Sequence, residues 1–500
     1  MNIKTSSRAR RVINVLTLTA LFLATSFSCV HYQARPITVQ KSLADFEERR
    51  LDSPELGQFL IANHEVDSWP PEVWDLKSLT LVAFYFNPQL DTARAQWAVA
   101  RAGRVTAAQI PNPVIGPKIG YNSTTPRDLI TPWIPEVSLD IPIEVAGKRG
   151  LRISEARHLS DAARFNILAA AWQVRSNLRQ ALLDLSISQK KLSLLDEQIL
   201  IQKELVKLME LRKAAGEVSG YELTQARLAL ETSQLDLIEA QKMVRQAKVN
   251  LASALGLSPE TLETAKISFD DLEKVATDIS AGELRRQALT NRADILSSLS
   301  EYAAAEASLH LEIARQYPDI TLGPSYQLDQ TDNKWTIGLS FELPIFNRNR
   351  GPIAEAQARR REKAASFLEL QATVISDLEK SIQNVRAAGQ KVLLSDELLQ
   401  HLEAQKAVAS RKLQVGEISK YDFLNLNLEL TATSLARLET LAEAQQATIE
   451  LENILQSPLQ IKDWIYTLDR EAGEAHADHE AQSQTATAAA AKEKTKDKKP

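Results

Sequence analysis

The sequence predicts a mainly α-helical fold with a small β part, built from one structural unit that occurs twice along the chain. The composition favours long helices, because the 500 residues include only 16 glycines and are rich in Ala, Leu, Glu, Gln, Lys and Arg. One segment matches another about 200 residues further along, and long proline-free stretches repeat apolar residues every seven positions. The net charge of −5 comes from interspersed acidic and basic residues, so we expect no nucleic-acid partner.

Residues 1–28 have the features of a signal peptide, which is removed from the mature protein. A basic start is followed by an apolar run from Val12 to Ala24 and then by small residues. Cys29 comes next and is the only cysteine of the chain, which excludes an internal disulfide and favours a lipoprotein acceptor cysteine. Ser26 stands where the lipoprotein pattern has an aliphatic residue, so an ordinary signal peptide stays open as an alternative.

The mature chain is expected to have five segments. An N-terminal arm at 29–79, extended and partly helical and laid on the outside of the tube that the long helices are expected to form, precedes the first copy of the repeated unit at 80–257. A linker at 258–283 leads to the second copy at 284–457. The tail at 458–500 is expected to be disordered from about residue 471, because it has almost no apolar bulk.

Matching motifs define the two copies. The sequence Gly-Glu-Val-Ser-Gly-Tyr-Glu-Leu at 216–223 returns as Gly-Glu-Ile-Ser-Lys-Tyr-Asp-Phe at 416–423. Ser-Leu-Asp-Ile-Pro-Ile at 138–143 returns as Ser-Phe-Glu-Leu-Pro-Ile at 340–345. Two further residues of the first copy, Pro111 and Gly116, correspond to Pro318 and Gly323. Each copy is therefore expected to run helix, strand, strand, helix, turn, helix.

The long helix of each copy has the pattern of a coiled helix pair. Apolar residues recur every seven positions at Leu178, Leu185, Leu192, Ile199 and Val206, and again at Leu378, Val385, Val392 and Leu399. Residues 151–212 contain no proline, so this helix is expected to be roughly 90 Å long. A fibrous dimeric coiled coil would share this pattern, so the helices alone leave that alternative open.

Alternating patterns in the middle of each copy predict strands with one apolar and one polar face. The apolar positions are Val137, Leu139, Ile141 and Ile143 in the first copy and Ile337, Leu339, Phe341, Leu343 and Ile345 in the second. Their expected partners are 114–121 and 320–328, with hairpin loops at 122–131 and 329–334. Trp133 and Trp335 are expected at the outer ends of the strands, as membrane-interface anchors or packed in a loop.

Four strands cannot close into a barrel, and their unpaired edges cannot face lipid. Two copies of the chain would give eight strands around an interior filled by side chains, whereas three copies would give twelve strands and a lumen. The apolar face of each strand suits contact with lipid. We therefore expect a homotrimer in which long coiled helices form a tube and the strands form a shared 12-strand transmembrane β-barrel.

These motifs, in this order, resemble the TolC superfamily of outer-membrane efflux proteins. Within it they are most similar to the branch that serves heavy-metal (cobalt-zinc-cadmium, copper) and multidrug transporters of the resistance-nodulation-division (RND) class. The residues that carry the resemblance are Pro344-Ile345-Phe346-Asn347-Arg348-Asn349-Arg350-Gly351, Ile353-Ala354-Glu355-Ala356, Gly147-Lys148-Arg149-Gly150 and the two Gly-Glu-x-Ser-x-Tyr turns. The resemblance implies a passive exit duct in the outer membrane, with a helical extension across the periplasm to an adaptor protein and an inner-membrane RND transporter.

The resemblance also assigns roles to the two glycine turns, which are the periplasmic tips in this family. It implies that the adaptor docks at Gly216, Glu217, Val218, Ser219 and Tyr221 in the first copy and at Gly416, Glu417, Ile418, Ser419 and Tyr421 in the second. It further implies an entrance gate at Asp422 and Asn425, with Glu222 as the first-copy equivalent of Asp422. Ordinary helix-breaking turns and helix-start carboxylates would explain the same residues.

No motif points to catalysis or to a bound cofactor. The sequence has no phosphate-binding loop, dinucleotide glycine motif, nucleophile elbow or zinc signature. His476 and His479 form a single pair in the tail, short of the three or four ligands of a metal site. We therefore expect no enzyme, no cofactor and no metal site. A type I protein secretion component and a periplasmic coiled-coil scaffold stay open as alternative functions.

Lipidation of Cys29 can be tested directly. Metabolic labelling with a palmitate analogue should mark the wild-type chain and leave Cys29→Ala unlabelled, because this residue carries the only thiol that can accept the lipid. The Cys29→Ala chain should still assemble, since closure depends on the strands. An unlabelled wild-type chain would instead identify residues 1–28 as an ordinary signal peptide.

Overall fold

The computed structural model describes residues 32–63, 69–124, 131–273, 281–329 and 332–459. The chain divides into two units, Met1–Arg49 and Arg50–Pro500, and each is described by itself. In the described part of the first unit, the helix α2 (Val39–Glu47) begins after Thr38. The Thr38 hydroxyl caps this helix by accepting a hydrogen bond from the backbone N–H of Lys41.

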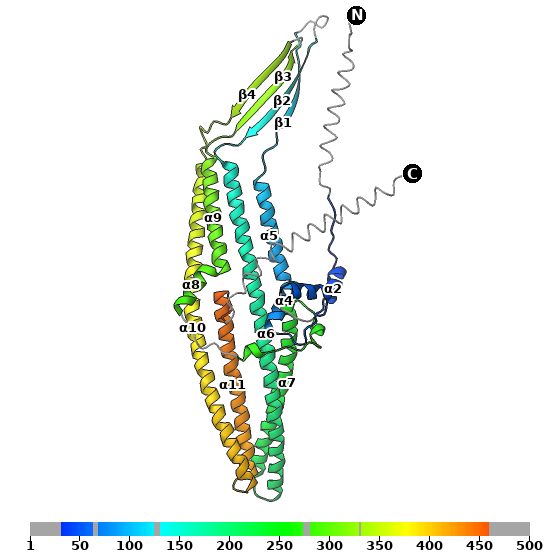
Figure 1. Ribbon diagram of the computed structural model, residues 1–500, viewed down its shortest axis with the longest axis vertical. Helices are drawn as coiled ribbons and strands as arrows, with labels where there is room; N and C mark the ends of the chain where they lie inside the picture. The colour runs from blue at the N-terminus through cyan, green and yellow to red at the C-terminus, as the bar shows by residue number, and fades with distance from the viewer. Residues whose placement is uncertain (1–31, 64–68, 125–130, 274–280, 330–331, 460–500) are drawn as a thin grey trace, which may run out of the picture. The chain divides into compact units, whose positions relative to one another are not determined.

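The second unit contains both copies, and they have the same order of elements (Figure 1). The first copy consists of α4 (Leu76–Phe86), α5 (Pro88–Ala107), β1 (Val114–Tyr121), β2 (Trp133–Ile143), α6 (Lys148–Ala214) and α7 (Gly220–Leu255). The second consists of α8 (Ala281–Asn291), α9 (Ala293–Ala314), β3 (Ile320–Asp329), β4 (Asp332–Phe341), α10 (Arg350–Gln414) and α11 (Lys420–Leu455). The expected mainly helical fold with a small β part is confirmed. None of the described helices is both long enough and apolar enough to span a membrane.

The first helix of each copy is broken in two, whereas the sequence predicted one helix. In the first copy the break is at Asn87, whose side-chain amide donates a hydrogen bond to the carbonyl of Ala254 at the end of α7, at 3.0 Å. In the second copy the break is at Arg292, whose guanidinium donates to the carbonyl of Ile454 at the end of α11. In both copies the end of the last helix is therefore held at the break in the first.

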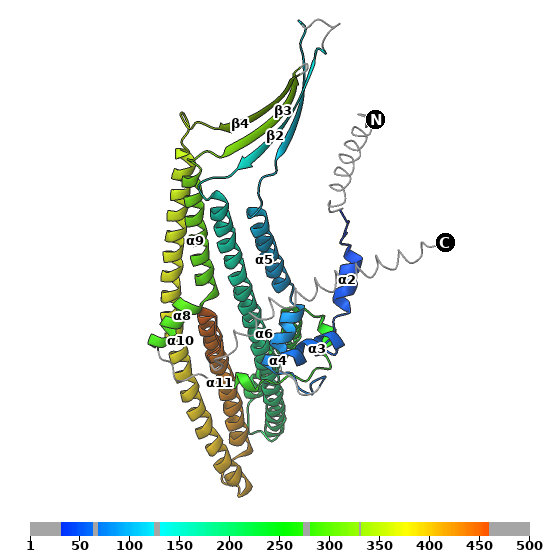
Figure 2. The same cartoon turned by 45° about the horizontal axis from the view of Figure 1, so that its top comes forward.

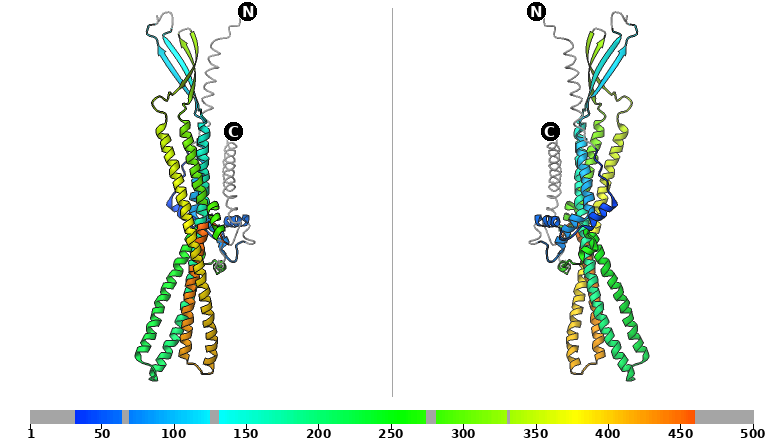
Figure 3. Two further views of the ribbon diagram at one scale, coloured as in Figure 1. Left: turned by 90° about the vertical axis from the view of Figure 1, so that its left-hand side faces the viewer. Right: turned by 90° about the vertical axis from the view of Figure 1, so that its right-hand side faces the viewer.

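The two long helices confirm the predicted seven-residue pattern. Six of the nine predicted positions on these helices are buried: Leu178, Leu185, Ile199, Leu378, Val385 and Val392. α6 packs on α5, α7, α9 and α11, whereas α10 packs on α8, α9 and α11. α6 therefore joins the two copies. In the lower half of Figure 3 the hairpins α6–α7 and α10–α11 run downward as two pairs of helices, and α6 of one pair contacts α11 of the other.

The four strands form one antiparallel sheet in the order β1-β2-β3-β4, so β1 and β4 are its edges (Figure 2). The register brings apolar residues of neighbouring strands opposite each other, as in Val137 with Tyr326 and Tyr326 with Trp335. The opposite face carries polar pairs such as Ser138 with Ser325. The predicted alternation is thereby confirmed, and one face of the whole sheet is apolar.

Two details of the second hairpin differ from the expectation. Its loop is shorter than 329–334, because β3 extends to Asp329 and β4 starts at Asp332. Lys334 lies within the strand, where it pairs with Gln327 in the register and forms an ion pair with Asp329. Trp335 is consequently the fourth residue of β4, whereas Trp133 is the first residue of β2, as expected for the outer end.

The part of the N-terminal arm that belongs to the second unit is packed into the core. α3 (Pro54–Ala62) contributes Leu56 and Leu60, and the first turn of α4, where the arm runs into the first copy, contributes Leu79 to a hydrophobic cluster with α6 and α7. Trp74 pairs with the linker between the copies, since its N–H donates to the carbonyl of Lys266 at 2.8 Å. The linker contains the short 3-10 helices η1 (Pro259–Leu262) and η2 (Asp270–Leu272). Cys29, His476 and His479 lie outside the described residues.

The junction of α7 with the α4–α5 break generates a stability prediction. Gly256 has φ +75°, and a Cβ there would lie 2.7 Å from the carbonyl oxygen of Phe86. Gly216 has φ +79° with open space around its Cβ position. Gly216→Ala should therefore cost about 1 kcal/mol for the left-handed backbone alone, and Gly256→Ala should cost about 2 kcal/mol or more because of the added clash. Thermal unfolding followed by circular dichroism would measure both, and equal losses would contradict the packing at Gly256.

Candidate functional site

The loop between α6 and α7, the first tip, is fixed by its own backbone hydrogen bonds. The N–H of Gly216 donates to the carbonyl of Lys213 at 3.0 Å, and the N–H of Glu217 donates to the carbonyl of Arg212 at 2.9 Å. This is the Schellman arrangement, in which a left-handed residue lets the turn satisfy the last carbonyls of a helix. Glycine is required at 216 by φ +79° rather than by lack of space.

α7 begins at a capping box. The Ser219 hydroxyl accepts a hydrogen bond from the N–H of Glu222 at 3.3 Å, and the Glu222 carboxylate accepts from the N–H of Ser219 at 2.7 Å. Hydrogen bonds from the backbone and the hydroxyl of Ser219 hold the pKa of Glu222 below its ordinary value. The Glu222 carboxylate is exposed, but it is turned back onto the start of its own helix.

The loop between α10 and α11, the second tip, repeats the glycine turn and the serine cap, but without the bond from the serine backbone N–H that completes the capping box at the first tip. Gly416 also has φ +79°, and the N–H of Glu417 donates to the carbonyl of Lys412 at 2.9 Å. The Ser419 hydroxyl accepts from the N–H of Asp422 at 3.1 Å and donates to the Asp422 carboxylate at 2.6 Å. The recurring Gly-Glu-x-Ser sequence is therefore explained locally, since it ends one helix and caps the next.

The apolar residues of the tips stabilise the same turns. Val218 and Ile418 precede the capping serines and are half-buried, which is the position of a hydrophobic staple. Ile418 and Phe423 pack on a small cluster formed by Leu402, Ala409 and Leu426. In the first copy, Leu223 is the counterpart of Phe423 and is buried.

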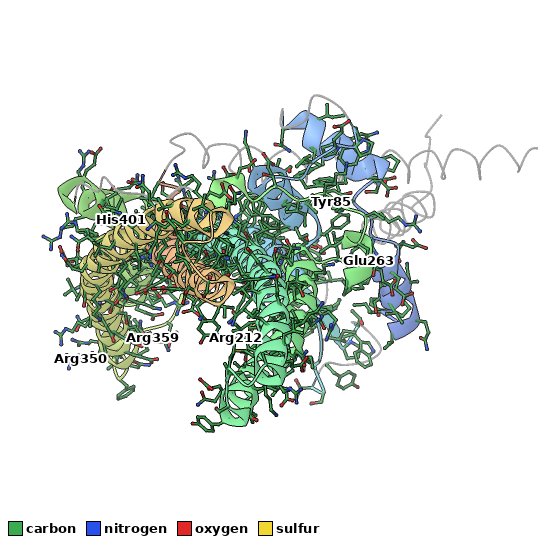
Figure 4. The ribbon with its side chains drawn as sticks, turned by 90° about the horizontal axis from the view of Figure 1, so that it is seen from below. Tyr85, Arg212, Glu263, Arg350, Arg359 and His401 are labelled. Carbon is green, nitrogen blue, oxygen red and sulfur yellow. The ribbon has the colours of Figure 1, made fainter. Side chains whose placement is uncertain are left out.

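Contacts between the two tips distinguish the two tyrosines, and the sequence did not predict them. The guanidinium of Arg212 lies 5.6 Å from the ring centroid of Tyr421, on the side of α6 that faces α11 (Figure 4). Lys420 forms an ion pair with Glu204 of α6 at 2.5 Å. Tyr421 is half-buried under this contact, whereas Tyr221 is 71% exposed. The tyrosine of the first tip is thus the more accessible to a partner.

One sequence signal for these contacts was available. Arg212 and Lys412 each precede the glutamate of their turn by five residues, and the structure pairs them with Glu217 at 3.1 Å and Glu417 at 4.0 Å. A basic residue at the same place in both copies indicates a role in the turn. Its contact with the other copy depends on tertiary packing, so the repeat alone could not identify it.

A buried ion cluster joins α6 to α11 above the tips. The sequence did not predict it. Arg175 lies 3.0 Å from the Glu452 carboxylate, and Arg179 pairs with the same carboxylate. Burial raises the pKa of Glu452, but the two guanidinium groups outweigh this effect and hold that pKa below its ordinary value. The N–H of Leu459 also donates to Glu452, at 3.1 Å. These groups have a structural role, because they fix one copy against the other.

The expected gate residues lie at corresponding places in the two tips. Glu222 and Asp422 are both exposed at the third position of their helices, and Asn425 is half-buried one turn further along α11. Within the described ranges, no group of three or more His, Cys, Asp or Glu residues is placed to hold a metal ion. The site is therefore a pair of capped turns with exposed carboxylates and an exposed tyrosine.

Comparison with known proteins gives consistent matches. A model of the outer membrane efflux protein family matches residues 85–257 and 284–456. The cobalt-zinc-cadmium resistance protein CzcC of Cupriavidus metallidurans is 24% identical over 374 residues, covering 74% of this chain and 87% of CzcC. The pyoverdine export outer membrane protein OpmQ of Pseudomonas aeruginosa is 23% identical over 343 residues, covering 66% of this chain and 69% of OpmQ. The solved structure of the outer membrane protein VceC from Vibrio cholerae shares the fold, with a TM-score of 0.62 and 20% identity over 77% of this chain and 97% of VceC.

Proposed function

We infer the function from one premise: the chain belongs to the outer membrane efflux protein family, whose model matches both of its copies. We propose that three copies form the exit channel of a tripartite efflux system, with the sheet in the outer membrane and the helices in the periplasm. The channel itself is a passive duct. An inner-membrane RND transporter drives export, and a periplasmic adaptor connects it to the channel. The observation that carries the proposal is a sheet with a continuous apolar face and two unpaired edges.

The exposed apolar surface supports a sheet face that meets lipid and helix sides that meet further copies of the chain. In β4, Ile337 is 78% and Leu339 is 68% exposed, and none of the described residues covers them. Exposed apolar residues also recur at seven-residue steps along the outer helices, at Leu228 and Leu235 on α7 and at Val408 on α10 and Val415 at its C-cap. Strands of eight to eleven residues are close to the length that a tilted strand needs to cross a bilayer. A closed ring of three copies would cover both the strand edges and the helix sides.

The relatives guide the proposed substrate class. CzcC is named for cobalt-zinc-cadmium resistance and OpmQ for pyoverdine export, and both are similarly distant from this chain. We therefore propose metal ions or small toxic compounds as substrates. A type I protein secretion channel would share the same duct and stays as the alternative. A periplasmic scaffold has no use for a sheet with one apolar face, so the observed sheet argues against it.

The two tips are the proposed docking sites for the adaptor. Tyr221 and Glu217 are exposed on the first tip, and Glu417 is exposed on the second. The turns do not need these side chains for their backbone hydrogen bonds, because Gly216, Ser219 and their counterparts already satisfy the backbone. We propose that the helical hairpins of the adaptor contact these side chains, and that Cys29 carries the lipid that anchors the mature chain.

Assembly is the first test of this function. Native mass spectrometry of the detergent-solubilised chain should give a complex of three copies. The strand edges must pair with other copies, because each backbone N–H or C=O left unpaired in lipid costs several kcal/mol. Planar-bilayer recording should detect a conducting pore from the same sample. A monomer or dimer as the dominant folded species would exclude the proposed duct.

The gate is the second test, and it can be made without disturbing the turns. Glu222→Gln keeps the capping hydrogen bonds and removes the charge, and Asp422→Asn does the same in the second tip. Three copies would bring six carboxylates around one entrance, so the double variant should lower the permeability ratio of cations over anions by about twofold or more. Block by multivalent cations added on the periplasmic side should weaken as well. Ser219→Ala is the matched control, since it breaks a cap and keeps the charge; wild-type selectivity in the double variant would mean that these carboxylates serve only as helix caps.

A further inference from the structure

The pairing of β2 with β3 shows how two copies of the unit meet inside one chain. β2 belongs to the first copy and β3 to the second, and they pair antiparallel, with Ser138 opposite Ser325 and Val137 opposite Tyr326. β4 and β1 are the corresponding strands at the two edges of the sheet, and neither edge is covered by the described residues. In a ring of identical chains, β4 of one protomer would meet β1 of the next.

We propose that β4 of one protomer pairs with β1 of the next protomer in the register that β2 and β3 use within the chain. The inference rests on the proposed trimer and specifies which residues meet at its seam. The partner is a second copy of this chain, because the seam repeats a junction that the chain already contains. Leu339 would then oppose Ile119 of the next protomer, and Ser340 would oppose Lys118 of the next protomer.

The sequence offset between the copies is well defined on both sides of the seam. β4 follows β2 by 202 residues, since Trp133 and Trp335 correspond, as do Ser138 and Ser340. The backbone keeps the same offset, because Gly147 and Asn349 both have positive φ immediately before α6 and α10.

On the other side of the seam, β3 follows β1 by 207 residues. Gly116 and Gly323 correspond, and the preceding helices α5 and α9 end at Ala107 and Ala314 with the same offset. Applied together, the two offsets turn the Ser138–Ser325 pair into Ser340 with Lys118 of the next protomer. They turn Val137–Tyr326 into Leu339 with Ile119 of the next protomer.

The faces of the strands agree with this register. Leu339 and Ile119 both lie on the apolar face, as judged from their partners Leu322 and Pro135 in the sheet. A slip by one residue would place Leu339 against Lys118 and reverse the faces of one strand, which is costly when one face meets lipid. A slip by two residues keeps the apolar residues on the same face. The choice among such registers therefore has to come from the pairing of β2 with β3 within the chain.

The strand ends provide that choice. Within the chain, the amine of Lys148 at the start of α6 lies 2.9 Å from the Asp319 carboxylate, just before β3, and only 8% of the Lys148 side chain is exposed. The N–H of Val145 donates to the same carboxylate at 3.1 Å. These contacts fix how far β3 can slide along β2. The hairpins β1–β2 and β3–β4 lack this restraint, and their registers differ by two residues. Gly116 opposes Ser138, whereas its counterpart Gly323 opposes Gly338 and not Ser340, the counterpart of Ser138.

The corresponding surface of the second copy is exposed. Arg350, the counterpart of Lys148 at the first position of α10, is exposed and projects from α10 on the side away from α6 (Figure 4). Phe346 is fully exposed in the segment before it. The counterpart of Asp319 is Asn112, so Arg350 would meet a neutral amide of the next protomer where the chain itself has an ion pair.

The proposed register also gives the barrel a consistent stagger. Within the chain, Gly116 of β1 opposes Ser138 of β2, Ser138 opposes Ser325 of β3, and Ser325 opposes Thr336 of β4. In the proposed register, Thr336 then opposes Asn122 of the next protomer. Each protomer therefore advances the strands by the six residues from 116 to 122. A steady advance in one direction is what the tilted strands of a closed barrel require.

Cysteine cross-linking in the full chain tests the register. Residues directly opposed across antiparallel strands have Cβ atoms about 5 Å apart, whereas diagonal neighbours are about 7 Å apart and too far for a disulfide. The double variant Leu339→Cys with Ile119→Cys should form a covalent trimer on oxidation in membranes. Pairing Leu339→Cys with Pro117→Cys or with Tyr121→Cys should give at least tenfold less. Each single variant controls for links through Cys29.

Every outcome of this test is informative. Dominant cross-linking with Pro117→Cys or Tyr121→Cys would overturn the copied register and leave the trimer intact. No cross-link in any pair, in samples whose native mass is trimeric, would show that the two edges do not meet. If the wild-type chain itself shows no trimeric mass, the proposed function is rejected instead. Ser340→Cys with Lys118→Cys tests the same register from the polar face if Leu339→Cys impairs assembly.

The contact at the strand ends has its own test. Asn112→Asp should restore the ion pair that Lys148 and Asp319 form within the chain, and so raise the temperature at which the trimer dissociates. The rise should vanish when Arg350→Gln is added, because the new carboxylate then has no cation to meet. An unchanged or lower dissociation temperature with Asn112→Asp would contradict the proposed contact.

Discussion

The packing of α6 against helices of both copies is the interaction on which the rest of the structure depends. α6 begins directly after β2 and runs past α9 and α11 of the second copy, so it positions the sheet and both hairpins. Its contact with α11 includes the buried pair of Arg175 and Arg179 with Glu452. Removing one member of such a cluster leaves a buried charge without a partner and costs several kcal/mol. The cluster therefore disfavours arrangements of the two copies that would separate these charges.

The two copies meet the same requirement at the ends of their hairpins with different residues. At the end of α7 the chain turns through Gly256, where the backbone of Phe86 leaves no room for a Cβ. At the end of α11 it turns through Gln456 with φ +48°, and the Gln456 side chain accepts a hydrogen bond from the N–H of Ala293 at 2.8 Å. One copy is close-packed and the other is held by a hydrogen bond. The duplication thus conserved the path of the chain while the chemistry at the junction diverged.

The sequence predicted what depends on local pattern and repetition. The seven-residue steps gave the long helices, the alternation gave the strands and their apolar face, and Gly216 and Gly416 gave the turns. The breaks at Asn87 and Arg292 could not be predicted in this way, because each depends on the end of a helix that comes more than 150 residues later. Arg175 and Arg179 are spaced like charges on an exposed helix face, and only the packing of α11 shows that they are buried. At the tips, the caps were predictable, and the contact of Arg212 with Tyr421 was not.

The position of the ion pairs along α6 has a consequence for the response of the protein to salt. Near the tips, Glu204 and Lys420 are about half-exposed, so their attraction is screened when the ionic strength rises. The cluster around Glu452 is buried, and salt screens it far less. Increasing ionic strength should therefore loosen the hairpins from each other at their ends while the middle of α6 keeps its partners. The same chain combines a pivot that is insensitive to salt with ends that separate more easily as salt increases.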